Sequence, residues 1–221
     1  MKLFLQAIIK IVLGFVIVGL LIFAPANTIN FWNGWLLIGL LFIPMFIAGI
    51  IMMIKSPELL KKRLNVKEKE NEQKQVVLFS GLMFLVGFIV SGLNYRYSWI
   101  VLKDFVVIIA SIVFVIAYVL YAEVLRENAY LSRTIEVQEN QKVVDTGLYG
   151  VIRHPMYAVT IVLFLAMPLV LGSLISFIIF LVYPFIIVKR INNEEKILEK
   201  ELTGYKEYKK KVKYKLIPFI W

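Results

Sequence analysis

Residues 156–188 read MYAVTIVLFLAMPLVLGSLISFIIFLVYPFIIV, a run of 33 residues without a charged side chain. As a single helix, at about 1.5 Å per residue, this run would be about 50 Å long, whereas the hydrocarbon core of a bilayer is about 30 Å thick. Pro168 and the pair Gly172-Ser173 lie near its middle and supply turn residues. The run therefore predicts a hairpin of two short or tilted helices, with one long kinked helix as the alternative.

Four other apolar runs are long enough to cross a bilayer, which takes about 20 mainly apolar residues. They span residues 3–24, 31–54, 76–93 and 99–122. The chain of 221 residues is 60% hydrophobic, more than a water-soluble fold of this size can hide. Its 14% aromatic content is too high for a disordered chain, and the absence of cysteine excludes a disulfide scaffold. We expect an all-α integral membrane protein with about five or six transmembrane helices, including the C-terminal hairpin.

The Lys and Arg residues gather on alternate connections between these runs. Seven lie in residues 55–75, four in 126–155 and ten in 189–221, whereas the connections between them hold none, one and none. By the positive-inside rule, this asymmetry predicts that both termini are cytoplasmic. The formal net charge of +10 then indicates a cytoplasmic surface that attracts anionic lipids, and we expect no nucleic-acid partner.

The basic connection at residues 55–75 divides into two parts. Ser56 as N-cap and Pro57 at the first helical position favour a short helix at its start. Residues 66–75 are charged and have no apolar period, so they are predicted to form a solvated, mobile loop. We therefore assign residues 1–125 to four transmembrane helices with this basic cytoplasmic loop, and residues 126–221 to the region that carries the chemistry.

The only histidine, His154, lies between Arg153 and Pro155, where the chain enters the hairpin. Pro155 disfavours a helical conformation at His154 and suits the first turn of the helix that follows. His154 is thus expected at an irregular corner, beside a helix N-terminus whose free N–H groups stabilise an anion. One histidine and no cysteine argue against a metal site.

The residues that follow the hairpin are predicted to form one helix with a single apolar face. The apolar residues at helical spacing are Ile191, Leu198, Leu202, Tyr205 and Val212. Arg190 and Glu194 are four residues apart, so they share a face and can pair. A surface ion pair is the simpler interpretation, but ionisable groups at the membrane boundary are costly and favour a functional role.

The two ends of a hairpin return to the same side of the membrane. Arg153 and His154 precede the hairpin, and Arg190, Glu194 and Glu195 follow it. We therefore expect these side chains to converge at the cytoplasmic membrane boundary, where a water-borne cofactor and a lipid-borne acceptor can meet.

Three stretches together resemble one known family. They read GLYGVIRHPMY at 147–157, RINNEE at 190–195 and GYKEYKKKVKYKLIPFI at 204–220. Their order and spacing around the hairpin resemble the isoprenylcysteine carboxyl methyltransferase family and, more loosely, the integral-membrane phospholipid methyltransferases. The similar region covers roughly residues 136–219, over a third of the chain. The resemblance implies a membrane-embedded methyltransferase with a cytoplasmic pocket for S-adenosyl-L-methionine.

By position in the family's motifs, the resemblance also implies which residues contact the cofactor. These are Gln138, Gln141, Lys142, Val143, Val144, Tyr149, His154, Pro155, Met156, Tyr157 and Glu194. Arg190 matches the family's arginine near the substrate. Gln141 stands where eukaryotic members usually have His, and Val159 stands where they have Gly. These two departures weaken the transfer of substrate identity to this chain.

Arg190, His154 and Glu195 are the candidate catalytic residues. A carboxylate acceptor needs a cation to hold it, and Arg190 fits that role. An amine acceptor has to lose a proton, which would give His154 or Glu195 the role of base. The favoured reaction is methyl transfer to a carboxylate of a lipid-like or prenylated acceptor from the bilayer.

Three alternatives to that reaction remain. One is a phospholipid or other lipid-amine N-methyltransferase, and another is a non-enzymatic scaffold or binder that retains the fold. A transporter is less favoured, because the sequence has no matched halves with broken helices. We expect the plasma membrane as the location in a bacterium and the endoplasmic reticulum in a eukaryote; the oligomeric state is left open.

Overall fold

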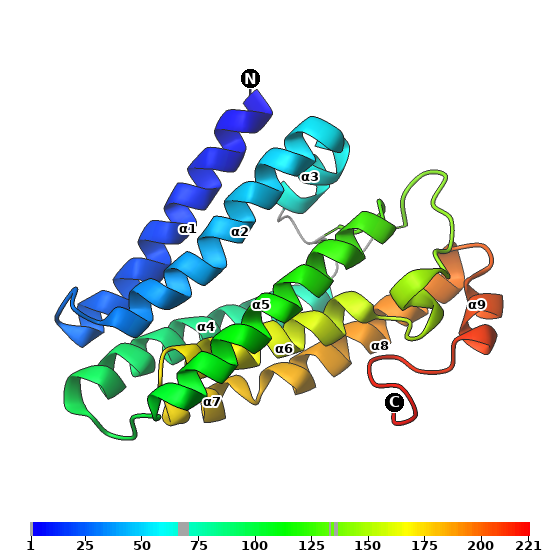
Figure 1. Ribbon diagram of the computed structural model, residues 1–221. Coiled ribbons are helices and arrows are strands. Elements are labelled where there is room, and N and C mark those ends of the chain that lie inside the picture. The colour runs from blue at the N-terminus through cyan, green and yellow to red at the C-terminus, as the bar shows by residue number, and fades with distance from the viewer. Residues whose placement is uncertain (1, 66–70, 133, 135–136) are drawn as a thin grey trace.

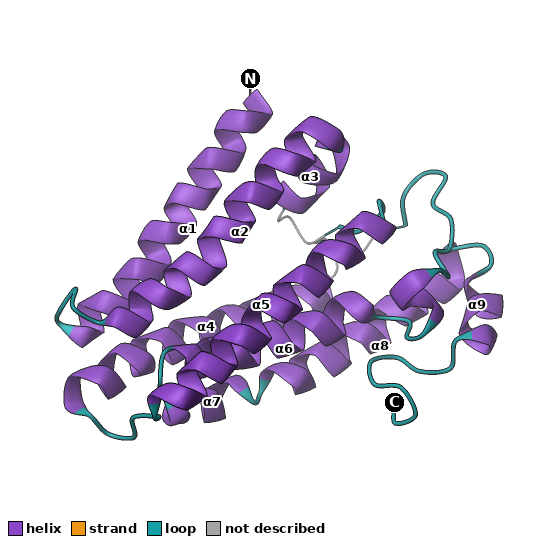
Figure 2. Ribbon diagram, in the orientation of Figure 1, coloured by secondary structure: helices purple, strands orange, loops and turns teal. Residues whose placement is uncertain are grey.

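The computed structural model describes residues 2–65, 71–132, 134 and 137–221, and within them it is all-helical (Figures 1 and 2). The first helices are α1 Lys2–Ala26, α2 Trp32–Lys55, α3 Pro57–Leu64, α4 Asn71–Tyr97 and α5 Asp104–Glu127. A short 3-10 helix, η1 Gly147–Gly150, precedes α6 Pro155–Val170, α7 Leu174–Phe180, α8 Tyr183–Glu201 and α9 Tyr205–Lys211. The all-α membrane architecture expected from the sequence is confirmed.

Among the described residues, five segments are long and apolar enough to cross a membrane, judged by length and composition. They are α1, α2, α4, α5 and the joined segment of α7 and α8, Leu174–Glu201. Helix α6 has 16 residues and is about 24 Å long, somewhat less than the thickness of a bilayer core. The chain is therefore a multi-pass membrane protein. Its apolar helix α6 is shorter than each of the five candidate spans.

The charge-free run folds as a hairpin, as the sequence predicts (Figure 1). Its two arms are joined at residues 171–173, where Gly172 has a φ of 72° and the Ser173 hydroxyl accepts a hydrogen bond from the backbone N–H of Ser176. The second arm is interrupted between α7 and α8, just before Pro184, whose missing N–H breaks the helical ladder. The single kinked helix is thereby ruled out.

The basic connection at 55–75 contains more helix than the sequence predicts. Helix α3 begins at Pro57 with Ser56 at its N-cap, as predicted, although the Ser56 side chain makes no capping hydrogen bond. Residues 66–70 of the predicted loop lie outside the described residues. Residues 71–75 belong to α4, so the prediction of a loop there is wrong. Glu, Gln and Lys are good helix formers, and Gln73 is fully buried, which a solvated loop would not allow.

The prediction of one continuous helix after the hairpin is also wrong. Helix α8 ends at Glu201, and Gly204 has a φ of 85°, in the left-handed region that interrupts a helix, before α9 begins. Leu202, Tyr205, Tyr208 and Val212 nevertheless form a small buried cluster. The apolar spacing therefore reflects a shared core at this end of the molecule rather than one uninterrupted helix.

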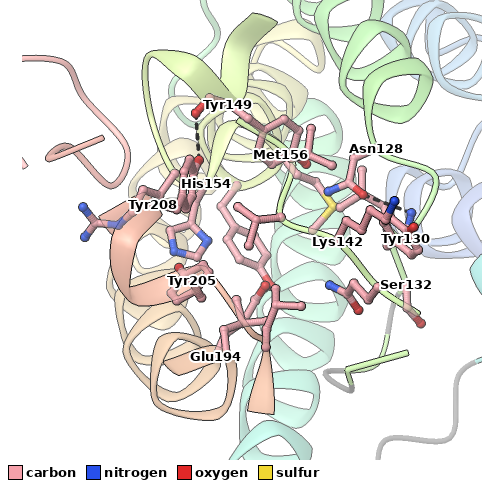
Figure 3. Close-up of a pocket in the computed structure, with 18 of the residues that line it drawn as sticks. Asn128, Tyr130, Ser132, Lys142, Tyr149, His154, Met156, Glu194, Tyr205 and Tyr208 are labelled. Carbon is pink, nitrogen blue, oxygen red and sulfur yellow. Dashed lines mark hydrogen bonds between the residues drawn. The ribbon is translucent and has the colours of Figure 1, made fainter. Parts of the chain in front are cut away.

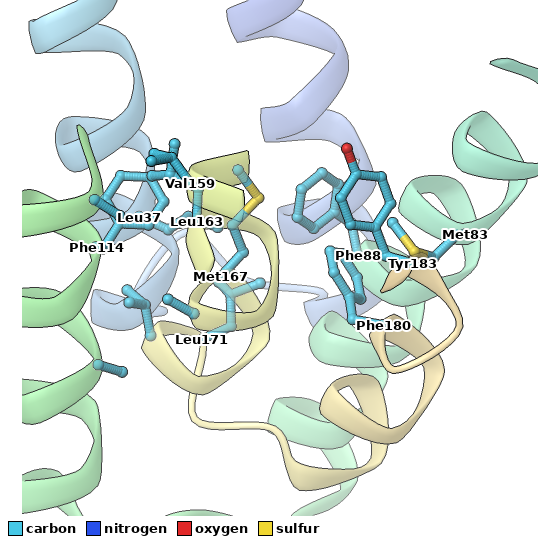
Figure 4. Packing of buried hydrophobic residues seen from close by; sticks show 14 of the residues in the cluster. Leu37, Met83, Phe88, Phe114, Val159, Leu163, Met167, Leu171, Phe180 and Tyr183 are labelled. Atoms are coloured by element: carbon cyan, nitrogen blue, oxygen red, sulfur yellow. The ribbon is translucent and has the colours of Figure 1, made fainter. Parts of the chain in front are cut away.

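Helix α6 lies in the middle of the bundle, between α5 on one side and α4, α7 and α8 on the other (Figure 4). On the first side its Val159 and Leu163 lie near Phe114 of α5. On the other side, Phe180 of α7 packs beside Phe88 of α4, with ring centres 6.1 Å apart. Helix α6 is thus packed by neighbouring helices on both of its sides.

Helices α1 and α4 approach each other closely at Gly92. A Cβ atom at this position would clash with the backbone carbonyl oxygen of Ile22 and would lie 3.0 Å from the backbone nitrogen of Ala26. Small residues at helix contacts are the usual means by which membrane helices approach closely. The α1–α4 contact therefore depends on the missing side chain of Gly92.

We expect Gly92→Ala to reduce the stability of the folded protein by about 1–3 kcal/mol, because α1 and α4 must move apart to admit the methyl group. The midpoint of thermal unfolding in detergent measures the effect. Gly81→Ala is the matched control, since Gly81 lies in the same helix and has no atom within 4 Å of its Cβ position. An equal loss of stability in both variants would contradict the close-approach explanation.

Candidate active site

The Arg153-His154 corner is held by the segment that follows α9. His154 is the N-cap of α6, with φ −125° and ψ 57°, and is not helical, as predicted. The backbone N–H groups of Arg153 and His154 donate to the carbonyl oxygens of Tyr214 and Lys215, each at 2.9 Å. The corner is therefore fixed by a chain segment about 60 residues away, a partner that the sequence alone does not reveal.

Glu195 is the centre of a buried group of charges. The Nε of Arg153 donates to a Glu195 carboxylate oxygen at 2.7 Å, and Nε2 of His154 lies 3.2 Å from the same oxygen. The Nζ atoms of Lys215 and Lys209 lie 3.3 Å and 3.6 Å from the other carboxylate oxygen of Glu195. The convergence of the two ends of the hairpin is thus confirmed by direct contacts, with Glu195 as their common partner.

Arg153 also binds the chain segment that follows α9. One of its terminal nitrogens donates to the carbonyl oxygens of Val212 and Lys213, at 2.8 Å and 2.7 Å. The side chain of Arg153 is almost fully buried, and it joins α6, α8 and the segment after α9. This buried guanidinium holds three segments of the fold together, and it also lines the pocket described below.

The hydroxyl of Tyr157 lies between Arg190 and Glu194. The Nε of Arg190 donates to this hydroxyl at 2.8 Å, and the hydroxyl donates to a carboxylate oxygen of Glu194. The guanidinium of Arg190 also lies 5.7 Å from the centre of the Tyr157 ring. The predicted shared face of Arg190 and Glu194 is confirmed, and the aromatic side chain of α6 connects the two.

One pocket brings these elements together (Figure 3). It is lined by the loop after α5, the segment before η1, the start of α6, and residues of α8 and α9. In Figure 3 the side chains of His154, Glu194 and Tyr205 lie around a common space, with Met156 and Lys142 across from them. A cation, an anion and several aromatic rings thus surround one cavity at an end of the helical bundle.

Most of the residues implied by the family resemblance line this pocket. They are Gln141, Lys142, Val143, Val144, Tyr149, His154, Met156, Tyr157, Glu194 and Arg190. Gln138 and Pro155 are not among the lining residues: the amide of Gln138 donates to the Tyr130 carbonyl oxygen at 2.6 Å, and Pro155 is buried at the start of α6. Glu195 also lies outside the lining, behind His154, in its ion pairs.

Sequence reasoning missed a second set of lining residues. They are Asn128, Tyr130, Leu131, Ser132, Thr134, Leu198, Leu202, Tyr205 and Tyr208. Tyr205 and Tyr208 belong to a motif that carried the family resemblance, so that motif could have indicated them. The residues from Asn128 to Ser132 have no such signal, because they are ordinary for a turn and become part of the wall only through the fold.

Three tyrosines of the pocket are buried outside the spanning segments. Burial raises the pKa of Tyr149, Tyr205 and Tyr208 above the usual value of tyrosine, so their hydroxyls remain protonated at neutral pH. The hydroxyl of Tyr208 donates to the carbonyl oxygen of Tyr149 at 2.7 Å. The Tyr205 hydroxyl is buried and has no hydrogen-bond partner among the described residues. An unpaired donor of this kind fits a ligand that brings an acceptor atom.

The described residues offer no cluster of three or more His, Asp or Glu side chains that could hold a metal ion. The chemistry available in the pocket is therefore that of Arg190, Glu194, His154 and the tyrosines. An anion at Arg190 and a cation at Glu194 could be held on either side of the Tyr157 ring.

Comparison with known proteins gives two matches. Residues 105–200 match the family model described as the isoprenylcysteine carboxyl methyltransferase (ICMT) family. The chain is also 29% identical over 91 residues to a Delta(14)-sterol reductase of Mus musculus, which is 40% of this chain and 22% of the relative. The chain thus matches only about a fifth of the length of that curated relative. The resemblance found in the sequence is confirmed by this match, since residues 105–200 hold the hairpin, the corner and Glu194 and are similar to the isoprenylcysteine carboxyl methyltransferase family.

Proposed function

We propose that the protein is a membrane methyltransferase that transfers the methyl group of S-adenosylmethionine to a carboxylate of a lipid-like acceptor. The observation that carries the proposal is the pairing of Arg190 and Glu194 through the Tyr157 hydroxyl at the wall of one pocket. These three residues lie within the segment that matches the methyltransferase family. The pocket thereby offers charged groups suited to both S-adenosylmethionine and a carboxylate acceptor, the reactants that the family resemblance implies.

The lining residues fit this cofactor. S-adenosylmethionine carries an ammonium, a carboxylate and a sulfonium whose methyl group leaves with the acceptor oxygen while the sulfur keeps the bond's electron pair. Glu194 suits the ammonium or the ribose hydroxyls, and the unpaired Tyr205 hydroxyl suits an acceptor atom of the same molecule. Tyr149 and Tyr157 offer aromatic faces for the adenine or the positive charge.

Arg190 suits the acceptor. Its guanidinium is almost fully buried and can hold a carboxylate through two parallel hydrogen bonds. A carboxylate is already a nucleophile at neutral pH, so the protein has only to align it and to exclude water. Arg190 and the pocket wall meet both requirements without a proton transfer.

The contacts of Glu195 speak against its role as the base that an amine acceptor would need. An amine would need a base, and His154 and Glu195 are the candidates for that role. Glu195 is held in ion pairs with Arg153 and two lysines, and the ring nitrogen of His154 lies against the same carboxylate. Glu195 is therefore engaged away from the acceptor, whereas His154 keeps its second ring nitrogen as a possible base. We favour the carboxylate because the guanidinium of Arg190 lines the pocket.

The orientation and surroundings follow from the charge distribution. We propose that both termini and the pocket face the cytoplasm, where most Lys and Arg residues of the connections gather. The acceptor then enters from the cytoplasmic leaflet, and anionic lipids surround the basic connections. Labelled methyl transfer into native membranes, followed by extraction, identifies whether lipid or protein is modified. Base-labile label would indicate methyl esters, and base-stable label would indicate amine methylation.

We expect the purified protein to bind S-adenosylhomocysteine, and Glu194→Ala to weaken that binding by more than tenfold, because one charge-assisted contact is lost. Isothermal titration calorimetry on the folded protein in detergent gives both dissociation constants. Glu199→Ala is the matched control, since Glu199 lies on the same helix and pairs with Lys209 outside the pocket. Folded wild-type protein that binds no S-adenosylhomocysteine would overturn the proposal.

A reductase is the second candidate, and the match to a Delta(14)-sterol reductase is the observation that favours it. A reductase needs a hydride donor, and the reduced nicotinamide dinucleotides are the common ones. Titration with the reduced phosphorylated dinucleotide, beside S-adenosylhomocysteine, separates the two functions. Binding of the dinucleotide alone would replace the methyltransferase with a reductase, and binding of neither would leave a scaffold.

A further inference from the structure

We propose that Arg63 of α3 is a second cation of this site and binds the carboxylate of the lipid-like acceptor at the edge of the pocket. The inference deepens the proposed function, since it rests on the pocket being the place of methyl transfer. It assigns a role to the short helix between the second and third spans, which lies outside the segment matched by the family.

Helix α3 is held against the pocket by contacts on two sides. At one end, the ammonium of Lys10 of α1 donates to the carbonyl oxygen of Leu64, the last residue of α3. On the other side, Nζ of Lys62 lies 3.5 Å from the carbonyl oxygen of Ala129 and 5.8 Å from the centre of the Tyr130 ring. Because Tyr130 lines the pocket, α3 is in contact with the pocket wall.

Arg63 reaches the same wall from within α3. Its guanidinium donates to the hydroxyl of Tyr121, lies 5.6 Å from the centre of that ring, and has a nitrogen 3.8 Å from the sulfur of Met156. Met156 lines the pocket and is followed by Tyr157, the partner of Arg190. The two arginines therefore approach the pocket through consecutive residues of α6.

The partners of Arg63 leave its charge unbalanced. A hydroxyl, a thioether and an aromatic ring surround it, and no carboxylate pairs with it among the residues that the structure describes. The side chain is partly buried beside the ends of spanning helices, where an unpaired cation is costly. A guanidinium in such a place favours binding an oxyanion through paired N–H groups.

The occupant that fits is an anion attached to an apolar tail. Helix α3 follows directly on the end of α2, and Leu59 and Leu60 are buried while Lys61 is exposed. An amphiphile lying in the adjacent leaflet would thus bring its headgroup to Arg63 and to the pocket behind Met156. A carboxylate there lies beside Met156, the neighbour in sequence of the Tyr157 that Arg190 contacts, which makes Arg63 a binding residue for the acceptor.

The test uses stearic acid with a nitroxide spin label near its carboxyl end, and the methyl ester of the same molecule as the uncharged control. The full-length protein is reconstituted in phosphatidylcholine bilayers at a pH at which the acid is ionised. Electron spin resonance gives the fraction of each probe that the protein immobilises. We expect wild-type protein to prefer the acid, and Arg63→Gln to lower that preference about fivefold, the effect of one basic residue on an anionic lipid.

Lys61→Gln is the matched control, because it removes a neighbouring positive charge of α3 that is exposed. Unchanged preference in Arg63→Gln, or an equal loss in Lys61→Gln, would overturn the proposal. If Arg63→Gln does not fold, Arg63→Lys is tested in its place. This variant keeps the positive charge but lacks the paired N–H groups, so it should retain part of the preference for the acid over the ester. A spin-labelled phosphatidic acid that is preferred to stearate would overturn the assignment to a carboxylate.

This measurement needs neither cofactor nor turnover, so it can fail independently of the proposed function. Preference for the acid without binding of S-adenosylhomocysteine would leave an anion site and remove the methyltransferase. Binding of S-adenosylhomocysteine without preference for the acid would keep the methyltransferase and remove Arg63 from it. In active protein, Arg63→Gln should raise the acceptor KM about fivefold and leave the dissociation constant of S-adenosylhomocysteine unchanged.

Discussion

Glu195→Ala is expected to destabilise the folded protein by about 3–5 kcal/mol, the usual cost of removing one partner from a buried ion pair. Glu195 is 3% exposed and is the shared partner of Arg153, His154 and two lysines. Without its carboxylate, the buried guanidinium of Arg153 loses its counter-charge. The expected result is a large fall in the midpoint of thermal unfolding in detergent, with loss of the folded peak in size-exclusion chromatography.

The control for this prediction is Glu199→Ala. Glu199 pairs with Lys209 as Glu195 does, but its side chain is 35% exposed, so its removal should cost at most about 1 kcal/mol. Glu195→Gln should fall between the two, because it keeps the shape and one acceptor oxygen. Equal unfolding midpoints for Glu195→Ala and Glu199→Ala would show that the buried group does not hold the fold, and Glu195 would return as a candidate for catalysis.

Arg190→Gln is expected to lower kcat/KM for methyl transfer by at least about a hundredfold while changing the affinity for S-adenosylhomocysteine by less than about threefold. A buried charge pair with the acceptor is worth several kcal/mol, and the variant removes it. Calorimetry and a labelled methyl-transfer assay measure the two quantities. Equal losses in both would remove Arg190 from the acceptor role.

Tyr157→Phe separates two explanations of that result. The variant removes the hydroxyl that receives the hydrogen bond of Arg190 and donates to Glu194, but leaves both charged side chains in place. If Arg190 contacts the acceptor, Tyr157→Phe should lower kcat/KM far less than Arg190→Gln. Matching losses would mean that Arg190 only positions Tyr157 and Glu194, and the acceptor contact would have to be sought elsewhere.

The hairpin and the corner could be predicted because they depend on local properties of the chain. The charge-free run is too long for one helix, and Gly172 with Ser173 supplies the turn. Pro155 disfavours a helical conformation at His154 whatever surrounds it. The return of Glu195 to Arg153 then follows from the geometry of a hairpin, without knowledge of any other contact.

The remainder of the site depends on contacts between distant segments, which no local pattern encodes. Spacing suggested that Tyr205 and Val212 continue α8, whereas the left-handed backbone of Gly204 separates them from it. The carbonyl groups that hold Arg153 are backbone atoms, and every residue has one. Likewise, the contact of Arg63 with Met156 needs the docking of α3, which depends on Lys10 from the first span.

The hydrogen bonds between the corner and the carbonyl groups of Tyr214 and Lys215 bear on the order of events during synthesis. The hairpin is synthesised before these residues, because it lies nearer the N-terminus. Until the later segment has been translated and folded back, the backbone of Arg153 and His154 lacks these partners. A nascent chain with a complete hairpin therefore has no fixed corner, and its pocket is finished only when the last residues fold back.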